Sequence, residues 1–127
     1  MRWVTLEDVI LFHEKIIEKI GGLSGIRDIR LIESAINKAF VTFEGQELYK
    51  DLEDKIPTTT FALIRNHGFI DGNKRIGIAV MLLLLKLNGV DLRYEQKELV
   101  ELGFGIADGS LDEKDIKGWI IRHLERN

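Results

Sequence analysis

The stretch His67–Gly89, HGFIDGNKRIGIAVMLLLLKLNG, joins a short polar, glycine-containing segment directly to the most apolar run of the chain. From Asn73 to Leu87 apolar residues occupy nearly every side of a helix, which predicts a helix buried at the centre of the fold. The apolar run is about half the length that a membrane crossing requires. We therefore expect a fold arranged around one central helix that ends at Asn88-Gly89.

Further helices are predicted on both sides of this axis. Thr5 with Asp8 forms a capping-box pattern, Asp28 is a typical N-cap, and either Ser110 or Asp112 can cap the last helix. Apolar residues then recur at helical spacing after each start. The expected helices cover residues 6–20, 28–39, 57–65, 95–107 and 112–125.

Pro57, the only proline, decides where the third helix is predicted to begin. Proline is tolerated in the first turn of a helix and not inside one, so residues 46–55 are assigned to loop or to a separate helical turn. Strand-like alternation is confined to Val90–Tyr94, which has no pairing partner. The sequence predicts an all-α, single-domain bundle of about six helices over residues 1–127.

Composition narrows the function classes. With 18 basic and 21 acidic side chains the chain has a formal net charge of −3, so neither nucleic acid nor a membrane is expected as a partner. The absence of cysteine excludes disulfides and thiolate metal sites. The N-terminus, MRWVTLEDVI, lacks the apolar region of a signal peptide, which favours the cytoplasm.

The junction between loop and central helix is predicted to bind an anion. The first free N–H groups of a helix and its dipole attract phosphate, and Gly72 permits a close approach to the backbone at Asn73. Lys74 and Arg75 occupy a helix start that disfavours cations, and a bound phosphate would offset that cost. Solvated surface charges are the alternative reading of these two residues.

Two neighbouring side chains complete a phosphoryl-transfer site. His67, with an unperturbed pKa of about 6.5, can accept a hydroxyl proton at neutral pH. Asp71 offers a carboxylate of the kind that holds Mg²⁺ beside nucleotide phosphates, although it could also serve as the N-cap of the central helix. Phe69 is expected to pin the loop to the core. His13, at helical spacing with apolar residues, is interpreted as a partly buried structural histidine bonded to backbone, outside the site.

The segment HGFIDGNKR resembles the signature of the Fic/Doc superfamily: His, any residue, Phe, any residue, Asp or Glu, Ala or Gly, Asn, Gly or Lys, Arg. The resemblance extends to GGLSG after the first helix and to the central apolar helix. Lys74 stands where nucleotidyl-transferring Fic enzymes have glycine, and Ile78 where they have a second arginine, which favours the death-on-curing (Doc) toxins. Gly72 replaces the usual alanine of Doc toxins, with little consequence expected.

The resemblance implies a toxin kinase that uses ATP and Mg²⁺ to phosphorylate a serine or threonine of a target protein, elongation factor Tu in the family, and so inhibits translation. His67 would be the general base and Asp71 the Mg²⁺ ligand. The residues from Gly72 to Arg75, including Asn73 and Lys74, would bind the nucleotide.

Control would fall to a separate antitoxin of the prevents-host-death type, because the chain lacks the inhibitory Ser/Thr-x-x-x-Glu-Gly/Asn pattern of Fic proteins. Two alternatives stay open at this point. One is AMP transfer by the same loop, and the other is a non-catalytic binding module that keeps the fold.

Overall fold

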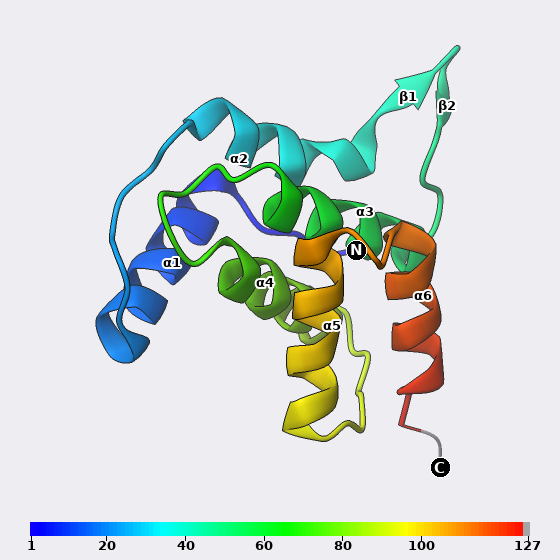
Figure 1. The fold of residues 1–127 in the computed structure, drawn as a ribbon. Coiled ribbons are helices and arrows are strands. Elements are labelled where there is room, and N and C mark those ends of the chain that lie inside the picture. The colour runs from blue at the N-terminus through cyan, green and yellow to red at the C-terminus, as the bar shows by residue number, and fades with distance from the viewer. Residues whose placement is uncertain (126–127) are drawn as a thin grey trace.

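The computed structural model describes residues 1–125, which form six α-helices and one small β-hairpin (Figure 1). The helices are α1 (Leu6–Ile20), α2 (Ile29–Asn37), α3 (Leu52–Arg65), α4 (Asn73–Leu87), α5 (Gln96–Asp108) and α6 (Glu113–Arg122), with a 3₁₀ turn η1 (Lys38–Phe40) and the strands β1 (Thr42–Phe43) and β2 (Gln46–Glu47). The predicted all-α fold class is confirmed.

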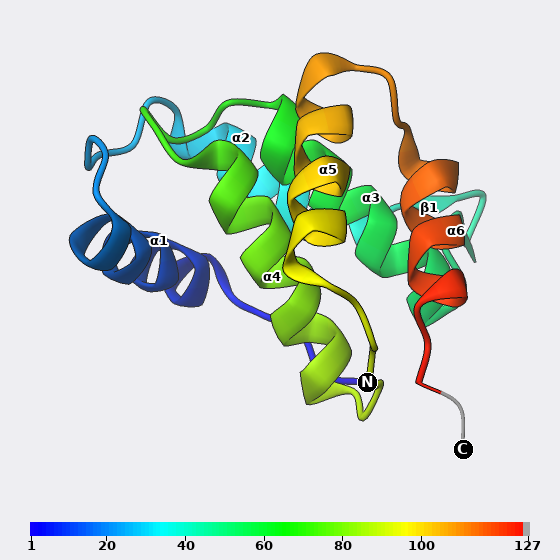
Figure 2. The same cartoon turned by 60° about the horizontal axis from the view of Figure 1, so that its bottom comes forward.

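Helix α4 is the axis of the fold, as its composition predicts. It packs against α1, α3 and α5, which surround it in the view of Figure 2. Ile76, Val80, Met81 and Leu84 are completely buried, and each such side chain contributes about 1.5–3 kcal/mol by leaving water. Within residues 1–125 no helix is both long and apolar enough to cross a membrane.

The predicted helix starts are confirmed at three positions. Thr5 and Asp8 bond reciprocally in a capping box before α1, and Asp28 accepts from the N–H of Arg30 at the start of α2. Asp112 caps α6, whereas Ser110 does not. Helix α6 begins where the cap predicts, but it ends at Arg122, three residues earlier than expected.

The prediction that a helix begins near Pro57 is wrong. Helix α3 begins at Leu52, so the proline lies inside it as the sixth residue. Its missing N–H leaves the carbonyl of the exposed Glu53 to solvent. The turn before it is held by tertiary contacts: Ile56 is fully buried and Nζ of Lys55 donates to the carbonyl of Ala39 at 2.9 Å. These contacts outweigh the proline penalty of about 3 kcal/mol.

The assignment of residues 46–55 to loop or to a separate helical turn is wrong at both ends, because Gln46–Glu47 form β2, which pairs with β1, and residues 52–55 belong to α3. The strands are antiparallel, with Thr42 opposite Glu47. The two turn residues, Glu44 and Gly45, have φ angles of 52° and 78°, as a two-residue hairpin turn requires. Glutamate is a rare first residue for such a turn, so the sequence signal was weak.

Candidate active site

The loop between α3 and α4 is closed by a reciprocal hydrogen-bond pair. Oδ1 of Asn73 accepts from the N–H of Phe69 at 3.0 Å, and its Nδ2 donates to the Phe69 carbonyl at 3.0 Å. The ring of Phe69 is only 1% exposed, which confirms its predicted role as the pin of the loop. The Asn73 side chain is therefore committed to loop closure.

His13 on α1 packs against two residues of this loop. Its ring stacks on Phe69 with 3.8 Å between centroids, and its Nε2 lies 2.7 Å from the carbonyl oxygen of Asp71. The side chain is 1% exposed. The prediction that His13 is a structural histidine bonded to backbone is confirmed. The carbonyl that it binds belongs to the loop between α3 and α4.

The carboxylate of Asp71 links the loop to the segment that follows α1. Oδ2 accepts from the N–H of Leu23 at 2.9 Å and Oδ1 from the N–H of Gly72 at 2.8 Å. These two backbone hydrogen bonds, aided by the charges of Arg75 and His13, hold the pKa of Asp71 below its ordinary value, so it is ionised at neutral pH. The alternative that Asp71 caps α4 is wrong, because Gly72 is the N-cap and no side chain caps this helix.

The N-terminus of α4 presents free donors. Gly72 has a left-handed conformation (φ 76°, ψ 17°), which turns the chain sharply into the helix. Among the hydrogen bonds of residues 1–125, none uses the amide N–H groups of Asn73, Lys74 or Arg75; the first is donated by Ile76 to the carbonyl of Gly72 at 2.9 Å. Three converging N–H groups at the positive end of a helix dipole are suited to phosphate oxygens.

All six predicted site residues line one pocket of about 320 Å³. These are His67, Asp71, Gly72, Asn73, Lys74 and Arg75. Ile64, Ile70 and Ala107 supply its apolar wall. An imidazole, a carboxylate, two cations and free backbone donors are thus brought to one cavity, and these are group types that phosphoryl-transfer sites use.

The two cations lie on the border of this pocket. Nζ of Lys74 is 3.5 Å from the ring centroid of Phe104 on α5, a cation–π contact, and Nη1 of Arg75 donates to the carbonyl of Gly21 at 2.9 Å. Lys74 and Arg75 also line the end of an adjacent groove of about 450 Å³ between α1, α4 and α5. The active-site pocket and the groove therefore share their charged residues.

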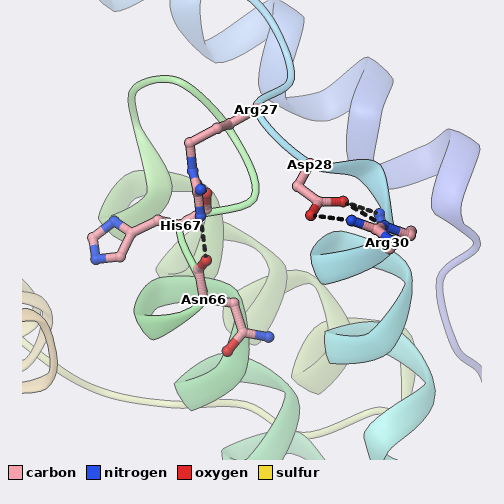
Figure 3. A network of polar contacts seen from close by, with 5 residues as sticks. All are labelled: Arg27, Asp28, Arg30, Asn66 and His67. Atoms are coloured by element: carbon pink, nitrogen blue, oxygen red, sulfur yellow. Dashed lines mark hydrogen bonds and ion pairs between the residues drawn. The ribbon is translucent and has the colours of Figure 1, made fainter.

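His67 has an unusual backbone that the sequence did not predict. Its φ is 52°, in the left-handed region, and its exposed imidazole points away from the other labelled side chains in Figure 3. Arg27 binds the carbonyls of His67 and Asn66 from the opposite side. Arg27 is the residue that sequence reasoning missed. It lies in the segment GGLSGIRD between α1 and α2.

Comparison with known proteins shows the family of this chain. A sequence model of the Fic/DOC family matches residues 3–85. The chain is 32% identical over 122 residues to "Protein kinase doc" of Escherichia phage P1, covering 96% of this chain and 95% of the relative. It is 38% identical over 72 residues to "Toxin Doc" of Mycolicibacterium smegmatis, covering 57% and 55%. The chain belongs to the Fic/DOC family, within its death-on-curing (Doc) branch.

Proposed function

We propose that this protein is a Doc-like toxin that transfers the γ-phosphoryl group of ATP to a serine or threonine hydroxyl of a target protein. The observation that carries the proposal is the single pocket in which His67 and Asp71 lie beside the free N–H groups of α4. The enzyme class, a kinase-type phosphotransferase, agrees with the name of the relative that matches nearly the full chain.

The residues present fit a nucleotide with Mg²⁺. The three free amides at the start of α4, with Lys74 and Arg75, would hold phosphate oxygens. Asp71 would hold Mg²⁺, because each of its oxygens accepts one hydrogen bond and keeps further lone pairs. Bound Mg²⁺ supplies positive charge where negative charge develops on the transferred phosphoryl group.

His67 acts as the general base. Its imidazole accepts the proton of the acceptor hydroxyl while the hydroxyl oxygen forms a bond to the γ-phosphorus. The bond from that phosphorus to the bridging oxygen breaks, and ADP leaves with the electron pair. Arg75 and Lys74 stabilise the phosphate charge from the rim of the pocket.

We propose elongation factor Tu as the acceptor, on the strength of the family resemblance, and the cytoplasm as the compartment, where the translation machinery is found. Phosphorylation of that factor would inhibit translation and arrest growth. The names of the two relatives, a protein kinase and a toxin, are consistent with this outcome.

We propose that an antitoxin of the prevents-host-death type covers the groove beside the pocket. The groove is lined mainly by apolar side chains of α1, α4 and α5, and Val100 at its edge is 45% exposed. Lys74 and Arg75 at one end suit an amphipathic tail with carboxylates at the matching end. Val100→Glu should reduce co-purification of the antitoxin, whereas Val41→Glu, equally exposed at 44% beside the hairpin, should not.

Intact-mass analysis after incubation with ATP, Mg²⁺ and elongation factor Tu tests the reaction. We expect a phosphoryl addition to the acceptor that His67→Ala reduces by about 10²–10⁴-fold. An adenylyl addition would instead indicate AMP transfer, and no addition with tight nucleotide-independent partner binding would indicate a binding module. Expression of wild type and His67→Ala in bacteria, with and without the antitoxin, tests toxicity.

A further inference from the structure

One residue binds three consecutive carbonyl groups at the start of the active-site loop. The guanidinium of Arg27 donates from Nη2 to the carbonyl of Asn66 at 3.0 Å and from Nε to that of His67 at 2.6 Å (Figure 3). Its backbone N–H donates to the carbonyl of Gly68 at 2.8 Å. The peptide groups on both sides of His67 are therefore fixed by the side chain and the backbone N–H of Arg27.

The backbone at His67 needs such support. Helix α3 ends at Arg65 with Asn66 as its C-cap, and His67 follows in the left-handed conformation with φ of 52°. Glycine or asparagine usually occupies this position, because a larger side chain is unfavourable there. The carbonyls at the end of the helix also carry partial negative charge, so a guanidinium is a suitable donor to them.

The guanidinium of Arg27 is committed to this contact. Among residues 1–125 it makes no ion pair with a carboxylate. The nearby Asp28 bonds to Arg30 instead, at 3.1 Å, and the Arg30 side chain is 86% exposed. The two arginines lie three positions apart, yet only Arg27 touches the active-site loop.

We propose that Arg27 is a positioning residue for His67: it holds the left-handed backbone that directs the imidazole into the pocket. The proposal rests on the function of His67 as general base. Arg27 itself does not line the pocket, so it acts through His67 and not through substrate. A general base must lie within hydrogen-bonding reach of the proton it accepts, and a small displacement is sufficient to slow the reaction.

The test compares Arg27→Ala, Arg27→Lys and the control Arg30→Ala in steady-state phosphorylation of elongation factor Tu. Arg27→Ala should lower kcat by about 10- to 100-fold, with KM for ATP changed less than about 2-fold. Arg27→Lys should recover part of kcat, because an ammonium can donate to one carbonyl but lacks the planar fork that reaches two. Each variant keeps the backbone hydrogen bond to Gly68, so the loop stays attached.

A crystal structure of Arg27→Ala provides a readout that does not depend on activity. We expect φ of His67 to change to a negative value, and retention of the left-handed backbone would overturn the proposal. Wild-type kcat in Arg27→Ala, or equal losses of kcat in Arg27→Ala and Arg30→Ala, would overturn it as well. If wild type transfers no phosphate, or His67→Ala remains fully active, the proposed function fails, and the φ measurement still decides the backbone role of Arg27.

Discussion

The Nε2 atom of His13 lies 2.7 Å from the carbonyl oxygen of Asp71, across 58 positions of sequence. A carbonyl can only accept, so Nε2 carries the proton in this contact. The same ring stacks on Phe69. Helix α1 is thereby joined to the middle of the active-site loop by a side chain that touches neither pocket nor solvent.

Replacing His13 should loosen the loop. His13→Phe keeps an aromatic ring for the stack on Phe69 but leaves the carbonyl of Asp71 without its donor, so we expect the free energy of unfolding to fall by about 1–3 kcal/mol. His13→Gln keeps a terminal N–H donor and loses the stack. Urea unfolding of both variants separates the two contributions. Unchanged stability in His13→Phe would show that the hydrogen bond contributes nothing.

The attachment of the loop through Asp71 should weaken in acid. Its folded-state pKa is lowered from 3.8 by the N–H groups of Leu23 and Gly72, so the folded state favours the ionised form and the unfolded state binds the proton first. The stabilisation is fully present above about pH 4 and is lost as pH falls below 3.8 through the folded-state pKa. Urea unfolding from pH 2 to 6 should show the difference between wild type and Asp71→Asn shrinking with acidity; parallel curves would contradict this.

Gly72→Ala tests the sharp turn into α4. The resemblance to Doc toxins predicts a mild effect, but the φ of 76° is costly for alanine, by about 1–2 kcal/mol. The new Cβ would also lie 3.2 Å from Cδ1 of Ile17 and 3.3 Å from Nε2 of His13. Gly45→Ala, at φ 78° with no atom within 4 Å of the new Cβ, is the matched control for backbone strain alone. A larger loss of stability at Gly72 than at Gly45 is expected.

Lys55→Met should release the hairpin from the body of the protein. Nζ of Lys55, 2% exposed, donates to the carbonyls of Ala39 and Tyr49 and to Glu47 at 3.1 Å. Glu47 is half exposed and can turn to water, but the two carbonyls lose their donor, and a buried acceptor left unpaired costs about 1–3 kcal/mol. Urea unfolding and proteolysis at the hairpin measure the effect. Lys50→Met, at an exposed lysine, should leave both readouts at wild-type values.

The site was predictable where its determinants are local. The end of α3, the start of α4 and the residue types between them lie within one short stretch, so His67, Asp71 and Arg75 could be placed in a single pocket from sequence. The role of Arg27 could not be predicted, because it depends on which backbone carbonyls its guanidinium reaches. That contact forms only when the segment after α1 docks along the loop, as in the bridge between Ile26 and Phe69.

The fold, too, was predictable from local patterns and not from tertiary contacts. The Thr5 cap was identified correctly because a capping box is a pattern of four adjacent residues, and Asp112 was one of two caps that the sequence offered for α6. Pro57 was misleading because the penalty it imposes is local, while the burial of Lys55 and Ile56 that offsets it is tertiary. The hairpin was missed for a related reason: strands of two residues carry no alternation to detect.

The reciprocal bonds between Asn73 and Phe69 have a consequence for control of the enzyme. They hold the loop in one conformation through the protein's own groups, so substrates meet a preorganised surface and little ordering entropy is lost on binding. We therefore expect inhibition by obstruction, with a partner occupying the space that the substrates need, rather than by unfolding of the loop.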